Sequence, residues 1–251
     1  MNTTPLISVV TITWNAAGVI APTLASLRAQ TCSDFEHVVI DGASSDATLE
    51  LVRRDGVPGA RILSEPDRGL YDAMNKGLHL ARGRYVVFLN AGDAFFAPDT
   101  LERYARAART GADIIYSDTV IVDSDGRITA PRHLSVPERL TAGSFARGML
   151  ICHQAFMVRR DIAPDYDLTY KLSADYDWTI RCIRSADPDR CINLHCVGIR
   201  YLSDGLTDRR AMESLKERFR VMAKHYGTLT AVARHISFIP RLLRRRLAGR
   251  R

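Results

Sequence analysis

Apolar runs in the first half of the chain are followed by polar or acidic residues that could bind a ligand. The run at 6–13 ends in Thr13 with Asn15 just beyond it, the run at 35–40 precedes Asp41, and Asn90 and Asp93 follow the run at 85–89. In an open parallel sheet, ligands bind beyond the carboxyl ends of the strands. Carboxylate and amide oxygens at those ends suit a divalent cation, Mn²⁺ or Mg²⁺, that neutralises a bound diphosphate.

A second group of polar residues is spaced along a predicted helix at 70–81. One face of this helix is apolar, and the opposite one carries a polar stripe at i, i+3, i+4 and i+7 made of Asp72, Asn75, Lys76 and His79. Such a stripe is typical of a solvated face with an Asp72–Lys76 ion pair, or of a surface that faces a ligand. Arg68 precedes the helix and could reach a phosphate.

The elements that position these residues follow a Rossmann-like α/β pattern. Strands predicted at 6–13, 35–40, 61–63 and 85–89 alternate with helices of about ten residues, which indicates βαβ units and a mostly parallel central sheet flanked by helices. The second half differs, because a strand predicted at 114–122 turns back at 123–126, and residues 131–150 have no clear period. The remaining predictions are strands at 154–158 and 196–201 and helices at 173–184 and 209–225. We therefore expect a smaller antiparallel portion in this half.

Composition and charge exclude several classes of protein. The net charge of the 251 residues is +7, and six arginines within the last eleven residues supply most of it: Arg241, Arg244, Arg245, Arg246, Arg250 and Arg251. The remainder has no basic stripe, so we expect no nucleic-acid partner. The sequence has no apolar run of 18 residues and no secretory signal, and its five cysteines lack close pairs, so we expect a cytoplasmic protein. Neither a GxGxxG nor a GxxxxGK[ST] motif occurs.

Five segments, in this order along the chain, together resemble the family 2 glycosyltransferases. They are ISVVTITWN, VVIDGASSDAT, SEPDRGLYDAMNKGLHLARGRYVVFLNAGD, CHQAFMVRR and KLSADYDWTIR. The resemblance covers roughly residues 6–205 and is closest to bacterial enzymes that build exopolysaccharide, capsule or lipopolysaccharide. It implies a GT-A fold, a nucleoside-diphosphate sugar as donor and inversion at the anomeric carbon.

The resemblance implies donor-side roles for the residues at the strand ends. Asp41 matches the acidic position that recognises the nucleotide base. Asn90-Ala91-Gly92-Asp93 aligns with the family's Asp-x-Asp region. Asp93 is therefore the implied metal ligand, and Asn90 is implied to bind the donor. Because Asn90 and Gly92 replace carboxylates of the family motif, this region carries less negative charge. The start of the 70–81 helix would lie beside the donor. The complete predicted donor side is Thr13, Asn15, Asp41, Arg68, Asp72, Lys76 and Asn90.

The resemblance also implies where the acceptor binds. Residues 173–178 match the family's acceptor motif, with Ala174 in place of its Glu, and Asp175 matches the catalytic base. Such a base takes the proton of the acceptor hydroxyl as its oxygen attacks. Asp177 is the reserve candidate and lies about 200° around the helix from Asp175. His153 and Gln154 match a family pair expected on the acceptor side.

These assignments predict the organisation of the chain and its partners. Residues 1–226 form the expected GT-A domain, with a nucleotide-sugar-binding half at 1–122 and an acceptor-binding half at 123–226. Residues 227–251 form a basic amphipathic segment that is expected to lie on an anionic membrane surface, on the inner face of the cell membrane, near a glycan or lipid-linked glycan acceptor.

Two alternative functions remain open at this stage. One is a non-catalytic sugar-nucleotide-binding protein, suggested by Asn90 and Ala174. The other is a nucleotidyltransferase on a related fold, although residues 14–19 are not the glycine-rich basic loop usual there.

Overall fold

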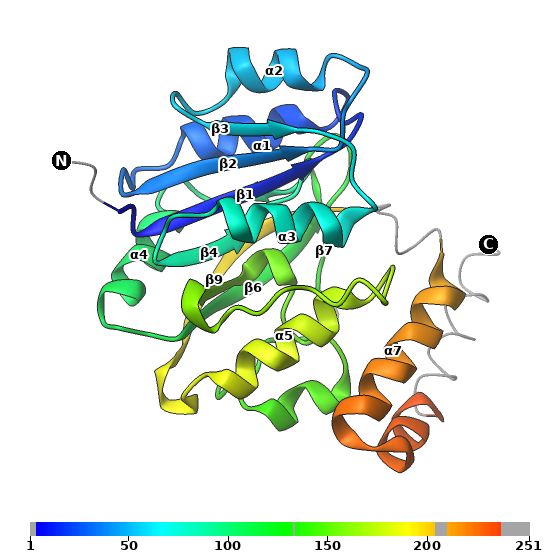
Figure 1. Cartoon of the computed structure of the whole chain (residues 1–251). Coiled ribbons are helices and arrows are strands. Elements are labelled where there is room, and N and C mark those ends of the chain that lie inside the picture. The colour runs from blue at the N-terminus through cyan, green and yellow to red at the C-terminus, as the bar shows by residue number, and fades with distance from the viewer. Residues whose placement is uncertain (1–3, 133, 204–209, 237–251) are drawn as a thin grey trace.

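The computed structural model describes residues 4–132, 134–203 and 210–236, and its centre is a single sheet (Figure 1). Within these residues the strand order is β3-β2-β1-β4-β8-β6-β9-β5, and β7 pairs with β6. Strands β1 to β4, β6 and β9 run in one direction, and β5, β7 and β8 run against them. The bounds are β1 Ile7–Thr13, β2 Phe35–Asp41, β3 Arg61–Ser64, β4 Tyr85–Phe88, β5 Ala94–Phe95, β6 Ile114–Val122, β7 Ile128–Pro131, β8 Phe156–Arg159 and β9 Cys191–Leu202.

Helices flank this sheet. The α-helices with described bounds are α1 Ile20–Arg28, α2 Thr48–Asp55, α3 Leu70–Leu80, α4 Thr100–Arg109, α5 Ala174–Ser185 and α7 Ala211–Tyr226. Helix α3 packs on β1 and β2, α4 packs on β6 and β9, and α7 packs on α5. Figure 1 shows α3 and α5 on the near face of the sheet and α1 behind it. Residues 228–236 are also helical, and the remainder of the predicted basic segment, 237–251, lies outside the described residues.

Helix α3 lies close on the sheet because residue 77 has no side chain. A Cβ atom at Gly77 would come within 2.5 Å of Val10 Cγ1 in β1 and 3.5 Å of Ile40 Cγ1 in β2. The same face of α3 buries Met74 and Leu78. Packing therefore fixes where the first turn of α3 stands relative to the ends of β1 and β2.

The predicted α/β alternation of the first half is confirmed, and the differences are confined to short or polar segments. Strand β5 has only two residues, which is too short to show a period. The strand predicted at 154–158 begins at Phe156, because residues His153–Ala155 form a 3₁₀ turn. Strand β9 starts five residues before its predicted start, because its first half contains polar residues and His195 at a φ of 48°. Within 131–150, a 3₁₀ helix spans Ala142–Arg147.

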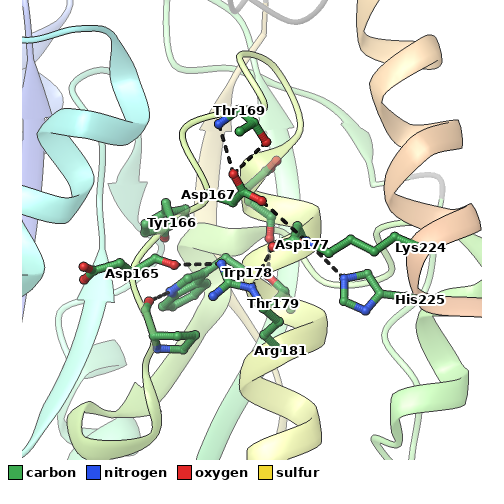
Figure 2. A network of polar contacts seen from close by, with 12 residues as sticks. Asp165, Tyr166, Asp167, Thr169, Asp177, Trp178, Thr179, Arg181, Lys224 and His225 are labelled. Atoms are coloured by element: carbon green, nitrogen blue, oxygen red, sulfur yellow. Dashed lines mark hydrogen bonds and ion pairs between the residues drawn. The ribbon is translucent and has the colours of Figure 1, made fainter.

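A buried carboxylate joins α5 to α7. Asp177 is 0% exposed, its Oδ2 accepts a hydrogen bond from Arg181 Nε at 2.6 Å, and its Oδ1 lies 3.0 Å from Lys224 Nζ and 2.8 Å from His225 Nε2 (Figure 2). Burial alone would raise the pKa of Asp177, but the hydrogen bonds from His225, Lys224 and Arg181 outweigh it and hold that pKa well below its usual range. Lys224 also reaches Asp167 at 3.4 Å, so the contact extends to the segment before α5.

Replacing Asp177 by asparagine should lower the free energy of unfolding by about 3–5 kcal/mol, because Arg181 and Lys224 lose the charge that compensates them. Urea denaturation followed by circular dichroism measures this change. Asp125→Asn removes an exposed carboxylate paired with Arg127 and is the matched control, with an expected change below about 0.5 kcal/mol.

The pH dependence of this contribution has a defined sign. Because the folded-state pKa of Asp177 is lowered, its stabilisation is present at neutral pH and is lost as pH falls below the unfolded-state value of about 4. Asp177→Asn should therefore lose less stability on acidification than the unaltered protein. Equal stability of the two proteins at pH 7 would contradict the role of the cluster.

Candidate functional site

The carboxyl ends of β1 and β2 form one polar surface. Thr13 pairs with Asp41 in the parallel register, and β4 flanks β1 on its other side. Just beyond β1, Asn15 is exposed and has a φ of 45°. Its Oδ1 accepts a hydrogen bond from the backbone N–H of Ser45 at 2.9 Å. The predicted donor residues Thr13, Asn15 and Asp41 are thus brought together.

Asp41 is completely buried, and serines engage both of its carboxylate oxygens. Oδ1 accepts from Ser44 Oγ at 2.5 Å, while Oδ2 accepts from the Ser44 backbone N–H at 2.9 Å and from Ser64 Oγ at 2.7 Å. Ser44 Oγ in turn accepts from the Asn15 backbone N–H at 2.8 Å. Asp41 therefore orders the loop after β2, and its role in recognising a nucleotide base stays a prediction.

Asp93, the predicted metal ligand, is held by two segments from the second half of the chain. Its Oδ2 accepts from Gln154 Nε2 at 2.6 Å, and its Oδ1 accepts from the backbone N–H of Leu202 at 3.0 Å. Asp93 is 4% exposed, and burial raises its pKa to about 7 despite these two hydrogen bonds. A predicted donor-side residue and a predicted acceptor-side residue are therefore in direct contact.

Two buried oxygens at this edge of the sheet have no hydrogen-bond partner among the described residues. They are Thr13 Oγ1, at the end of β1, and Asn90 Oδ1, just after β4. A buried polar atom that is left unpaired costs about 1–3 kcal/mol, so native proteins rarely keep one without a reason. Both residues were predicted to bind the donor, and both present an oxygen that a ligand could satisfy.

Asn90 and Asp93 fit a divalent cation only if a bound ligand supplies further oxygen atoms to it. Asn90 Oδ1 and the Asp93 carboxylate are hard oxygens of the kind that Mg²⁺ and Mn²⁺ prefer. No group of three or more His, Cys, Asp or Glu side chains that could hold a metal ion occurs within 4–132, 134–203 and 210–236. A cation at this edge would complete its coordination with oxygens of a bound diphosphate.

Asp175 lies in the first turn of α5 and is half-buried. Its Oδ1 accepts a hydrogen bond from the hydroxyl of Tyr71, in the first turn of α3, at 3.1 Å. His153 is within electrostatic reach of Asp175 and is itself buried, and that burial lowers its pKa, so its imidazole is neutral at pH 7. No partner for His153 Nε2 occurs among the described residues.

The two candidate bases occupy different environments. Asp177 has both oxygens engaged by side chains of α5 and α7, whereas Asp175 is partly exposed and its carboxylate accepts a hydrogen bond from Tyr71. This agrees with the predicted angle between them on the helix. The geometry favours Asp175 as the group that can meet a substrate, and its role as base stays a prediction.

The polar stripe of α3 makes structural contacts that differ from the expected pair. Asp72 pairs with Arg68 at 2.8 Å, and Lys76 pairs with Glu65 at 2.8 Å, so the Asp72–Lys76 ion pair is not the one formed. Lys76 also donates to the carbonyl of Pro66 at 2.8 Å. These contacts order the loop between β3 and α3, with the side chain of Arg68 largely exposed.

A pocket of about 380 Å³ lies behind the Asp93 turn. Helix α1, strand β5 and the turn after β6 line it, and Gly92 and Leu202 form its boundary with the Asp93 turn. None of the described residues lining it is a predicted site residue. The pocket is therefore adjacent to the strand-end site without being part of it.

Sequence reasoning missed the residues that connect the site. Tyr71 was hidden because a tyrosine on a buried helix face looks like a core residue. The hydrogen bond between Gln154 and Asp93 joins residues 61 positions apart, which no local pattern encodes. The sequence signal for His153 and Gln154 was their match to a family pair expected on the acceptor side, which did not point to Asp93.

Comparison with known proteins identifies relatives of this chain. Residues 8–166 match the family model described as Glycosyl transferase family 2. The PGL/p-HBAD biosynthesis glycosyltransferase of Mycobacterium bovis (strain BCG / Pasteur 1173P2) is 37% identical over 187 residues, which are 71% of this chain and 70% of the relative.

Solved structures show the same fold at low sequence identity. S. aureus TarS 1-349 has a TM-score of 0.68 and 18% identity, with 93% of this chain and 72% of that chain covered. Glucosyl-3-phosphoglycerate synthase from Mycobacterium tuberculosis, solved with Mn²⁺, UDP and glucosyl-3-phosphoglycerate, has a TM-score of 0.60 and 19% identity, with 89% and 80% covered. These likenesses confirm the predicted GT-A fold.

Thr13→Val should separate ligand binding from stability. Valine keeps the shape of threonine and removes the unpaired hydroxyl, so the free energy of unfolding should stay equal or rise by about 1 kcal/mol. Affinity for UDP or GDP with Mn²⁺, measured by calorimetry, should fall by about 5–10-fold because a hydrogen bond is lost.

Thr119→Val is the matched control for this experiment. Thr119 Oγ1 in β6 is also buried without a partner among the described residues, but it is not at the predicted site. Its replacement should leave nucleotide affinity unchanged. Unchanged affinity in Thr13→Val would remove Thr13 from the donor site.

Proposed function

The chain belongs to glycosyl transferase family 2, and on this premise we propose an inverting transfer from a UDP- or GDP-linked sugar to a glycan hydroxyl. The observation that carries the proposal is the turn His153–Ala155. Gln154 in this turn donates to Asp93, and the neighbouring His153 lies within electrostatic reach of Asp175. One short segment thus connects the donor edge of the sheet to the candidate base.

In this reaction Asp175 takes the proton of the acceptor hydroxyl, and the acceptor oxygen attacks the anomeric carbon of the donor sugar. The bond from that carbon to the diphosphate oxygen breaks on the opposite face, so the configuration inverts and the diphosphate leaves with the electron pair. Thr13 and Asn90 bind the donor at the strand ends. Because His153 is neutral, it forms no ion pair with Asp175, and the Asp175 carboxylate stays available to take the proton.

The donor class and the cation are supported by the residues and by the structural relatives. TarS has been solved with UDP and with UDP-GlcNAc, and the mycobacterial synthase with UDP and Mn²⁺. In this chain Asn90 Oδ1 and the Asp93 carboxylate would hold Mn²⁺ or Mg²⁺, which would neutralise charge on the departing diphosphate.

For the acceptor we propose a lipid-linked glycan of cell-envelope synthesis. The relative named above acts in PGL/p-HBAD biosynthesis, so the exopolysaccharide, capsule or lipopolysaccharide branch expected from the sequence is not confirmed. The two alternative functions differ from glycosyl transfer in the product released. A non-catalytic sugar-nucleotide-binding protein releases no product, and a nucleotidyltransferase releases pyrophosphate instead of UDP or GDP.

The test of this proposal is Asp175→Asn. Turnover, measured as UDP or GDP released from a panel of sugar nucleotides with Mn²⁺ and a bacterial lipid extract, should fall by about 10²-fold or more because the base is lost. Donor affinity, measured by calorimetry with and without EDTA, should change by less than about twofold. Near-normal turnover in this variant, with collapse in Asp177→Asn, would move the base to Asp177.

We also place the protein on an anionic membrane surface through its last residues. In the helical stretch 228–236, Leu229 is 87% exposed, Val232 42% and Ile236 61%, and they lie at i, i+3 and i+7 on one face. The arginine-rich sequence from 241 onward follows directly. Apolar contact together with basic charge is the combination that binds anionic bilayers. Among the described residues, no helix is both long and apolar enough to cross a membrane.

Removing the chain after Ile236 should reduce sedimentation with anionic vesicles, because each lost arginine contributes about 1 kcal/mol at such a surface. This cut retains Ala231, which is completely buried, so the domain stays intact. High salt should release the full chain from the vesicles. In the full chain, Leu229→Gln should weaken binding without a change in the salt effect. Equal sedimentation of the full and shortened chains would exclude the tail as an anchor.

A further inference from the structure

Tyr71 links the helix on the donor side to the candidate base. It is the second residue of α3, it is 6% exposed, and its hydroxyl donates to Asp175 Oδ1 at 3.1 Å. The two residues are 104 positions apart in the sequence and come from the first turns of two helices. Among the described residues, no other hydrogen bond reaches the Asp175 carboxylate.

An aromatic stack fixes the ring of Tyr71. Tyr71 stacks on Tyr166 with ring centroids 5.6 Å apart, and Tyr166 stacks on Trp178 of α5 at 4.8 Å and 9°. Phe88 of β4 meets Tyr166 and Trp178 edge-on at 5.6 Å and 5.9 Å. Such pairs favour defined ring orientations. The hydroxyl of Tyr71 is therefore aimed at Asp175 by packing, from both the sheet and α5.

The Tyr71 hydroxyl is a dependable donor. Burial raises the pKa of Tyr71 well above its usual value, and the nearby Asp175 charge raises it further. The phenol is therefore protonated at neutral pH, and it donates to Asp175.

We propose that Tyr71 is a positioning residue for the proposed base: it holds Oδ1 of Asp175 and leaves Oδ2 to meet the acceptor hydroxyl. The inference rests on the proposed function, because it assigns a task to the residue that holds the base. A carboxylate that is free to rotate would present its oxygens in many orientations, and misplacement of a reacting group lowers the rate. Tyr71 removes that freedom.

Several other titratable groups face the pair and have to be considered in any pH measurement. His153 and Cys152, beside the 3₁₀ turn, and Tyr166 interact electrostatically with Asp175, and Glu217 of α7 acts on Tyr71. Burial raises the pKa of Cys152 to about 11 and lowers that of His153. Neither group carries a charge at neutral pH, so the Tyr71 hydrogen bond is the contact that a variant can test.

The experiment compares Tyr71→Phe with Tyr166→Phe in the full chain. Each variant removes one hydroxyl from the same aromatic stack, but the Tyr166 hydroxyl is buried without a hydrogen-bond partner among the described residues. The first readout needs no substrate. In protein labelled with ¹³C at aspartate carboxyls, the Asp175 signal is assigned by its loss in Asp175→Asn, and its chemical shift is compared between the variants at pH 7.

Tyr71→Phe should change the chemical shift of the Asp175 carboxyl carbon, because that carboxylate loses a hydrogen bond. Tyr166→Phe should leave it unchanged. The second readout is the release of UDP from UDP-GlcNAc with Mn²⁺ in a bacterial lipid extract. In Tyr71→Phe, kcat should fall about tenfold, and the donor KM should be unaltered.

The outcomes separate this inference from the proposed function. An unmoved Asp175 signal in Tyr71→Phe, or an equal movement in Tyr166→Phe, overturns the positioning role whatever the turnover shows. Normal turnover in Asp175→Asn overturns the proposed base instead. Inactive Asp175→Asn together with fully active Tyr71→Phe would leave the base in place and reject Tyr71.

Discussion

The structure depends on satisfying carboxylates that are buried almost completely, among them Asp41, Asp93 and Asp177. A charge removed from water is costly unless donors from the protein surround it. In each case those donors come from separate segments: serines after β2 and in β3 for Asp41, Gln154 and the end of β9 for Asp93, and cations of α5 and α7 for Asp177. Each carboxylate thus joins pieces of chain that hydrophobic packing alone would hold less specifically.

This arrangement brings the two halves of the chain to one place. The first half supplies strand ends with polar groups, and the second half supplies Asp175 and the turn that contains His153. Asp93 belongs to the first half, but both hydrogen bonds to its carboxylate come from the second. A donor bound at the strand ends would therefore lie against residues of both halves. The division at residue 122 into a donor half and an acceptor half stays a prediction.

The parts predictable from sequence are those encoded by local periodicity. The buried run of β1 and the spacing of Met74 and Leu78 in α3 gave strand and helix correctly, and 100° per residue already separated Asp175 from Asp177. The resemblance supplied the roles. What could not be predicted is long-range: which partner Asp72 chooses, that Gln154 reaches Asp93, and that Tyr71 reaches Asp175. Such contacts depend on packing distances that no single segment contains.

The missing side chain at residue 77 has a consequence for the geometry of the whole site. Gly77 sets the distance between α3 and the sheet, with Val10 directly beneath it. Residue 77 lies six residues, or about 9 Å along the helix axis, from Tyr71. Because a helix moves as a stiff rod, even a single methyl group at 77 would tilt or lift α3 and shift its far end. The absence of a Cβ atom at Gly77 lets α3 lie directly on the sheet. It thereby sets how α3, which carries Tyr71, is aligned with α5, which carries Asp175.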